Sequence, residues 1–223
     1  MFDFDLTRLL YVVPAIIVAL TFHEYAHARM AYAFGDSTAK DAGRLSLNPL
    51  RHLDVIGALM LIFVGFGWAK PVPINPWYFG ENRKRKILWV SLAGPASNIL
   101  QAFLGSAIMA LMMKLIAYPS NIIIYLFSLL NYYVQINVAL AVFNLIPVPP
   151  LDGSKILGSL LPDRQLGLIL SLERYGFLIL MLLCFLPNVL GWLGLPQFDL
   201  LGIIISVPAS WIVNGMFSLL GML

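Results

Sequence analysis

Charge is scarce in this chain: of its 223 residues, only 11% are Asp, Glu, Lys or Arg, whereas 60% are hydrophobic. A soluble domain of this size needs considerably more charge to cover its surface. The apolar residues also occur in runs long enough to cross a hydrocarbon layer of roughly 30 Å, which takes about 20 helical residues. The composition therefore excludes a soluble globular protein and predicts an integral membrane protein in contact with the lipid bilayer.

Cysteine and dense basic clusters are almost absent as well. The single cysteine, Cys184, lies in an apolar run, so no internal disulfide can form and we interpret it as a packing or lipid-facing residue. The one dense basic run, Arg83–Lys86, abuts an apolar span, which argues against nucleic-acid binding and favours contact with anionic headgroups. Because Asp3 and Asp5 precede the first arginine, we expect no cleavable signal peptide.

The apolar segments predict an all-α polytopic membrane protein with about five to six transmembrane helices. The second segment is too short to span, so we expect a re-entrant or partly buried element there. Ala42–Leu47 and Lys70–Asn75 flank it as short extended stretches. They could form a membrane-associated β-hairpin whose edge pairs with a substrate strand, or be plain loops. The six segments are Leu9–Phe34, Ile56–Trp68, Ile87–Ala117, Ile122–Ile146, Leu166–Leu186 and Leu200–Leu220.

The distribution of Lys and Arg predicts the orientation of these segments. Basic residues follow both the first span and the short segment, so both loops should be cytoplasmic and the N-terminus outside. The last two spans should then form an external hairpin around Pro187–Pro196. We expect one membrane-embedded domain over residues 1–223, with a core at about 8–160 and a C-terminal helical hairpin at about 165–223.

The first span contains the run His23-Glu24-Tyr25-Ala26-His27. Residues four apart share one face of a helix, which lets two imidazoles bind one Zn²⁺ ion while the glutamate takes a proton from a bound water. With three His and three Glu in the chain, random placement would produce this pattern with a probability of about 5 in 10,000. The alternative, polar packing between helices, is disfavoured because ionisable groups in a membrane helix are usually functional.

A catalytic zinc ion needs a third protein ligand. The fourth apolar segment is followed by Pro147, Pro149 and Pro150, which break the helix, and Asp152 comes just after this break. The first and fourth spans run in the same direction, so Asp152 should arrive at the depth of the two histidines. Asp152 is therefore the predicted third ligand, although it could instead cap the following helix.

These motifs resemble the site-2 protease family of intramembrane zinc metalloproteases, peptidase family M50. The resemblance implies zinc ligands His23, His27 and Asp152, a catalytic Glu24 that activates zinc-bound water, and Asn144 as a residue that positions substrate or stabilises the oxyanion. The chain looks like a minimal member without a PDZ or CBS domain. The motifs are His23–His27, Asn48–Asp54, Lys70–Asn75, Ala93–Asn98 and Asn144–Gly153.

Three further polar residues have open roles. Asn144 could equally satisfy backbone groups freed by the prolines. Asn98 could bind substrate or support the site, but an interhelical hydrogen bond is favoured. His52, the one histidine outside the motif, is a candidate pocket or supporting residue rather than a ligand.

The predicted function is regulated intramembrane proteolysis: a zinc metalloendopeptidase that cleaves transmembrane or membrane-proximal segments of single-span membrane proteins. The resemblance places it in a bacterial cell membrane with the active site toward the cytoplasm, and leaves the oligomeric state open. A zinc-binding scaffold is a rival, but it would not need Glu24. A metal or proton transporter would need polar residues along several spans, and the last two are nearly bare.

Overall fold

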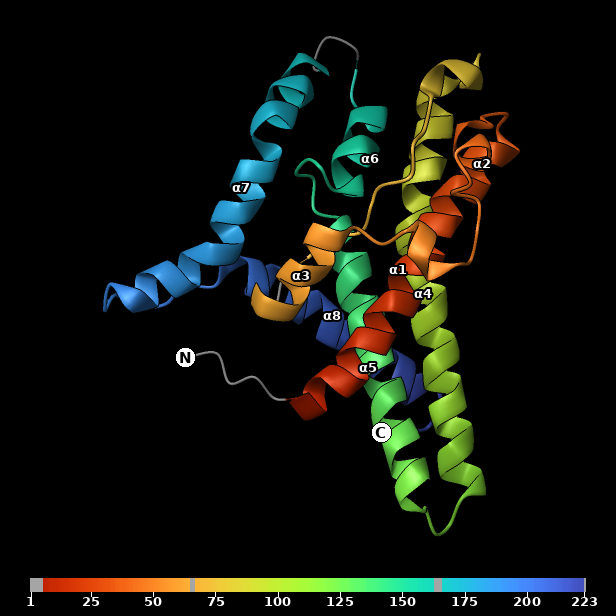
Figure 1. The fold of residues 1–223 in the computed structure, drawn as a ribbon, viewed down its shortest axis with the longest axis vertical. Coiled ribbons are helices and arrows are strands. Elements are labelled where there is room, and N and C mark those ends of the chain that lie inside the picture. Colours follow the sequence, from red (N-terminus) through yellow and green to blue (C-terminus); the bar gives the residue numbers. More distant parts are fainter. Residues whose placement is uncertain (1–5, 65–66, 163–165, 223) are drawn as a thin grey trace.

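The computed structural model describes residues 6–64, 67–162 and 166–222, and this part of the chain is helical (Figure 1). Five helices are long and apolar enough to cross a membrane, namely α1, α4, α5, α7 and α8. The protein is therefore an integral membrane protein, as its composition predicted. The helices are α1 (Leu6–Ala33), α2 (Thr38–Asp41), α3 (Val55–Val64), α4 (Arg83–Leu115), α5 (Asn121–Asn144), α6 (Asp152–Leu160), α7 (Leu166–Trp192) and α8 (Leu200–Leu219), with short 3₁₀ turns at Pro49–Arg51 and Pro76–Phe79.

The short apolar segment forms α3, a helix of 10 residues, which is too short to cross a bilayer. Within the described residues there is no β-strand, so the structure does not support the β-hairpin expected around this segment. Residues 67–75 instead run as an extended loop beside α1.

The reason lies in the hydrogen bonds of this loop. Pro71 and Pro73 have no N–H to offer to a neighbouring strand. The N–H groups between and beyond them donate to carboxylates on α1 and on the loop that follows it, which leaves few donors for a ladder. These bonds join Val72 N to Glu24 Oε2 at 3.1 Å and Asn75 N to Asp36 Oδ2 at 2.7 Å.

Three long helices form the centre of the molecule. In Figure 1, α4 and α5 lie antiparallel, joined by a short turn, and α1 crosses them. α8 packs on α5 and on part of α4. The apolar core between α4, α5 and α8 consists of Ala102, Met109, Val134, Val138, Ala209, Val213 and Met216.

The C-terminal hairpin turns later than predicted. α7 does not end at Leu186 but continues through Pro187 to Trp192, and Asp199 then caps α8 by accepting a hydrogen bond from Gly202 N at 2.7 Å. A proline inside a helix cannot donate to the carbonyl one turn earlier and bends the helix rather than always ending it. α7 accordingly changes direction in its C-terminal half (Figure 1).

Candidate metal centre

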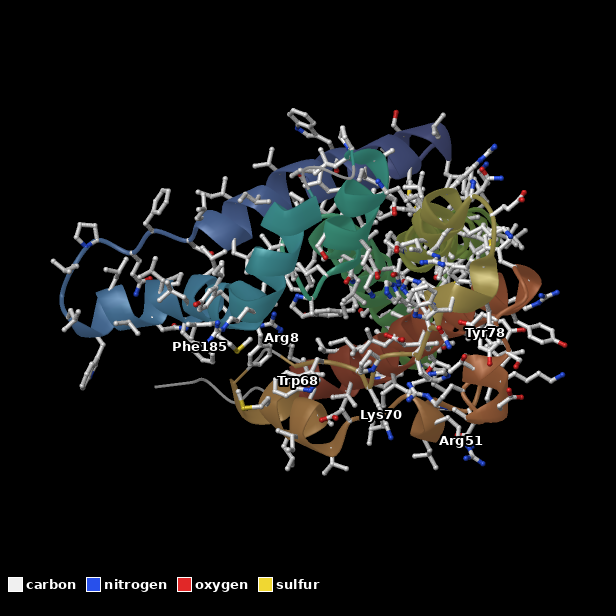
Figure 2. The ribbon with its side chains drawn as sticks, turned by 90° about the horizontal axis from the view of Figure 1, so that it is seen from above. Arg8, Arg51, Trp68, Lys70, Tyr78 and Phe185 are labelled. Carbon is white, nitrogen blue, oxygen red and sulfur yellow. The ribbon has the colours of Figure 1, made fainter. Side chains whose placement is uncertain are left out.

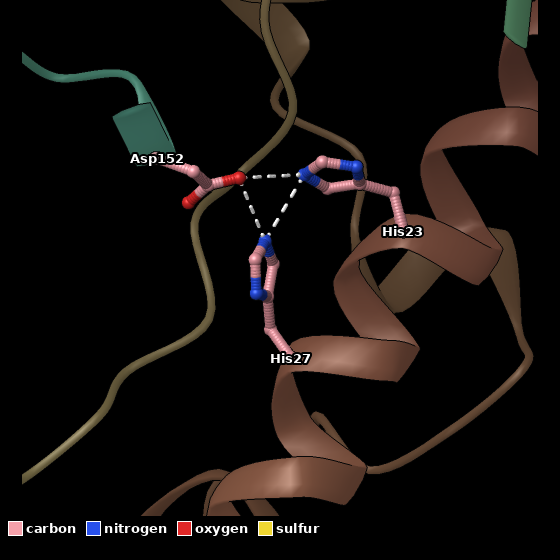
Figure 3. Close-up of side chains that lie close together, drawn as sticks. All are labelled: His23, His27 and Asp152. Atoms are coloured by element: carbon pink, nitrogen blue, oxygen red, sulfur yellow. Dashed lines mark hydrogen bonds and ion pairs between the residues drawn. The ribbon is translucent and has the colours of Figure 1, made fainter. Parts of the chain in front are cut away.

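Two histidines project side by side from the second half of α1. His23 and His27 are one helical turn apart, and their Nε2 atoms lie 3.0 Å from each other (Figure 3). Both side chains are buried. The two imidazoles therefore meet at one point, as expected for residues four apart on one face of a helix.

A carboxylate from a distant segment meets them. Beyond the end of α5 the chain turns, and α6 begins at Asp152. Its Oδ2 atom lies 3.1 Å from His27 Nε2 and 3.3 Å from His23 Nε2 (Figure 3). Asp152 therefore contacts both histidines, whereas no side-chain hydrogen bond caps α6.

The turn before Asp152 is tight. A Cβ atom on the next residue, Gly153, would lie 2.3 Å from the carbonyl oxygen of Leu145. Only glycine permits this approach of α6 to the end of α5, because any other residue would collide with backbone. The proline-broken segment and Gly153 together fix where the carboxylate stands.

The Asp152 carboxyl is held in its charged form. Burial alone would raise its pKa, but positive charge at His27 and His23 acts in the opposite direction and holds the pKa of Asp152 well below its usual range; a cation bound among the three side chains would supply that charge when both imidazoles are neutral. Its position in the first turn of α6 also favours negative charge, since helix N-termini carry partial positive charge. The group therefore contains an anionic oxygen.

The outer ring nitrogens of both histidines have acceptors. His27 Nδ1 lies 2.7 Å from the carbonyl oxygen of Val90, and His23 Nδ1 lies 2.6 Å from Asn98 Oδ1. A backbone carbonyl can only accept, so His27 Nδ1 must carry the hydrogen. If His23 Nδ1 donates in the same way, both Nε2 atoms turn lone pairs toward Asp152 Oδ2.

Three converging lone pairs repel one another unless a cation lies among them. Four ligands around a zinc ion at 2.0–2.1 Å are about 3.3–3.4 Å apart in tetrahedral geometry. The three separations in this group, 3.0, 3.1 and 3.3 Å, are close to that value. Two imidazole nitrogens and one carboxylate oxygen also form a typical donor set of catalytic zinc. The residues present therefore fit a zinc ion.

The space beside the histidines depends on one glycine of α4. A Cβ atom on Gly94 would lie 2.3 Å from His27 Nε2 and 2.6 Å from His23 Cε1. Any larger residue would thus occupy the place of the imidazoles. Gly94 and Asn98 are one turn apart on α4, so one face of this helix both makes room for the histidines and supports His23.

Glu24 lines the same pocket as the three candidate ligands. The pocket has a volume of about 410 Å³. Glu24 is only partly buried, and its Oε2 atom accepts the hydrogen bond from Val72 N, which ties the carboxylate to the loop 67–75. Other residues of the lining are Trp68, Pro71, Leu140, Asn144, Lys155, Phe177 and Leu180.

Asn144 and His52 occupy different places. Asn144 lines the pocket, and its Nδ2 donates to the carbonyl oxygen of Leu140 at 3.0 Å. His52 is buried outside the ligand group, where its Nε2 lies 2.7 Å from Ser46 O and its own carbonyl accepts from Lys70 N. His52 therefore supports the loops around α3, and it lines an apolar cavity between α1 and α3 that adjoins the metal pocket.

Three residues that surround or support the histidines were missed by reasoning from the sequence. Gly94 was noticed only as part of a motif, and Asn137, which bonds Asn98, was not noticed at all. Val90 acts through its backbone, which no side-chain pattern reveals. The spacing of Gly94 and Asn98 was a usable signal, because it puts both on one helix face.

Fold and site together define a helical membrane protein with a buried group of residues suited to a metal ion. The sequence profile described as peptidase family M50 matches residues 11–186. The chain belongs to this family and is therefore a zinc metalloprotease. The predicted resemblance to site-2 proteases is confirmed as membership of peptidase family M50.

Relatives agree with this assignment. YwhC of Bacillus subtilis, whose name designates a candidate zinc metalloprotease, is 42% identical over 188 residues, which cover 82% of this chain and 84% of YwhC. Rip2 of Mycolicibacterium smegmatis, named in the same way, is 27% identical over 186 residues, 81% of this chain and 69% of Rip2. MJ0611 of Methanocaldococcus jannaschii is 29% identical over 153 residues, 67% and 71% of the two chains. No solved structure is significantly similar to the chain.

Proposed function

We propose that this zinc metalloprotease cleaves transmembrane or membrane-proximal segments of single-span membrane proteins, using one zinc ion. The observation that carries the proposal is the shared pocket: Glu24 and the three candidate ligands line one cavity, and helices long enough to span the membrane supply half of its lining residues. Such a site is reached by a substrate that lies in the bilayer.

In this proposal His23, His27 and Asp152 hold the ion, which when bound would polarise the scissile carbonyl and the attacking water. Glu24 accepts a proton from that water and delivers it to the leaving nitrogen. The hydrogen bond from Val72 N orients Glu24 for both transfers. A helical substrate must unwind locally first, because its carbonyls are otherwise bonded within the helix.

Asn144 contributes at the wall of the pocket. A side-chain amide has two N–H donors, and one of them is used by the carbonyl of Leu140. The second can donate to the oxygen that gains negative charge during attack. Asn144 would thus combine the two roles that its position at the end of the helix suggested, bonding its own helix and the reacting group.

The active site should face the cytoplasm of a bacterial cell. Eight of the 14 Lys and Arg residues lie between the end of α1 and the first turn of α4, and α2 and the start of α4 lie at one end of the molecule, whereas the α4–α5 turn lies at the opposite end (Figure 1). Positive charge gathers on the cytoplasmic side of membrane proteins. In a Cys184→Ala background, Ser120→Cys should react with an impermeant thiol reagent added to intact cells and Glu81→Cys should not. The reverse labelling would overturn the orientation.

The central test uses purified protein and a single-span substrate in vesicles. Glu24→Gln should bind zinc as wild type does but cleave at least about 100-fold more slowly, since it removes the general base. Chelation should stop cleavage by the wild type, and added zinc should restore it.

Glu81→Gln is the matched control, because Glu81 lies exposed in the loop before α4; it should cleave normally. Equal cleavage by wild type and Glu24→Gln would remove Glu24 from the reaction. Cleavage that resists chelation would remove zinc from it.

A further inference from the structure

Behind His23, a line of side-chain amides continues away from the metal centre through three helices. His23 Nδ1 on α1 lies 2.6 Å from Asn98 Oδ1 on α4. Asn98 Nδ2 lies 2.8 Å from Asn137 Oδ1 on α5. The line ends at the carbonyl oxygen of Tyr133, 2.9 Å from Asn137 Nδ2. Both asparagines are 0% exposed.

The last carbonyl fixes the direction of every bond in this line. Because Tyr133 O can only accept, the NH₂ group of Asn137 must face it, and the amide oxygen of Asn137 must face Asn98. That oxygen accepts from the NH₂ group of Asn98, so Asn98 turns its own oxygen to His23. His23 Nδ1 must then carry the ring hydrogen, and Nε2 keeps its lone pair.

We propose that Asn137 is a positioning residue of the metal centre, which acts through Asn98 to hold His23 in the tautomer that binds zinc. This inference rests on the proposed role of His23 as a ligand. In the other tautomer, Nε2–H would point at His27 and Asp152 and block binding. Asn137 itself touches neither the ion nor the substrate.

Different acceptors hold the two histidines in the same tautomer, with the hydrogen on Nδ1. His27 Nδ1 donates directly to a backbone carbonyl, that of Val90, which no substitution can remove. His23 depends on two replaceable side chains, and an asparagine can turn its amide over. Without Asn137, Asn98 would retain only a long contact of 3.4 Å from its Nδ2 to the carbonyl of Ala19 to hold its orientation.

The ordinary alternative is that Asn137 merely joins α4 to α5, as buried amides do between membrane helices. The two roles differ in what they predict for zinc. A structural amide lowers the stability of the fold when removed and leaves zinc affinity in the folded protein unchanged. A positioning amide lowers zinc affinity and does so only while Asn98 is present.

The test measures zinc affinity of the full-length protein by competition with a chelating dye. Groups that orient metal-bound histidines typically change metal affinity by 10- to 100-fold. We expect Asn98→Ala to fall in that range, and Asn137→Ala and Asn137→Leu to weaken zinc binding by about 10-fold. Asn137→Asp should stay within about threefold of wild type, because a protonated carboxyl donates its O–H to Tyr133 O and accepts from Asn98 with its other oxygen.

Two comparisons separate positioning from stability. Val138→Ala removes fully buried apolar contacts from the neighbouring position of α5; it should lower the unfolding temperature and leave zinc affinity unchanged. The double variant Asn98→Ala/Asn137→Ala should bind zinc no more weakly than Asn98→Ala alone, because Asn137 acts through Asn98.

Wild-type affinity in both Asn137→Ala and Asn137→Leu would overturn the inference, and so would additive losses in the double variant. A wild-type protein that binds no zinc would instead refute the proposed metal centre. The proposal about Asn137 and the proposed function can thus fail separately.

Discussion

The central helices and the C-terminal hairpin differ in the polarity of their side chains. In Figure 2, nitrogen and oxygen atoms gather over α1, α2 and the start of α4, whereas the side chains around α7 and α8 are nearly all carbon. Among the described residues, the buried polar and charged side chains lie between Thr21 and Ser154, that is, before α7 begins. The hairpin instead exposes large apolar residues such as Leu178 and Leu182.

This difference shows where the structure is tightly specified. A buried polar group in a membrane protein requires a partner of the right kind at the right distance. An apolar side chain facing lipid has no such requirement, because lipid tails solvate it as well as another helix does. We therefore expect the same type of substitution to abolish zinc binding in the centre and to have little effect in the hairpin.

The largest contrast should come from two aspartates. Asp152→Ala removes a candidate ligand, so we expect zinc affinity to fall at least about 100-fold, more than the loss of a supporting group causes. Asp199→Ala removes the N-cap of α8, which should lower stability by about 0.5–2 kcal/mol and leave zinc affinity unchanged. Dye competition and thermal unfolding measure the two effects. Equal zinc affinity in both variants would exclude Asp152 as a ligand.

Two helical glycines give the next contrast. Gly94→Ala would place a methyl group 2.3 Å from His27 Nε2, and we expect zinc affinity to fall by more than about 10-fold because the imidazoles must move. Gly215→Ala in α8 meets nothing within 4 Å. It should stabilise the helix by up to about 1 kcal/mol without affecting zinc. Normal zinc binding by Gly94→Ala would show that α4 can move away from the two imidazoles to make room for the methyl group.

The features that could be predicted from the sequence are those set by local geometry and by the bilayer. The five long apolar helices were predictable because the bilayer requires runs of a definite length, and the pairing of His23 with His27 because helical spacing is fixed. The meeting with Asp152 followed from the direction of the spans. These features depend on local geometry and on the membrane, both of which can be read along the chain.

The remaining features depend on contacts between distant segments. Asn137 gains its place only because α5 lies against α4, and the loop 67–75 is extended without being a strand because Glu24 and Asp36 bind its N–H groups. α7 continues through Pro187 with a bend, and a proline in the sequence does not by itself indicate whether a helix ends or bends there. The predicted roles of Glu24, Asn144 and the domain limits stay predictions.

The smallest expected effect concerns an aromatic contact that joins the two regions. Phe177 on α7 meets Trp68 of the loop 67–75 edge to face, with ring centroids 5.8 Å apart, and both line the pocket. Such pairs contribute about 0.5–1.5 kcal/mol, which corresponds to a change of about 2- to 12-fold. If a membrane substrate packs against this wall, as in the proposed function, Phe177→Ala should raise KM by no more than that range, while zinc affinity stays normal. Leu178→Ala, at the next position but 67% exposed, should leave KM unchanged. A loss of zinc in Phe177→Ala would mean that the hairpin does support the metal centre, and the division between the two regions would have to be abandoned.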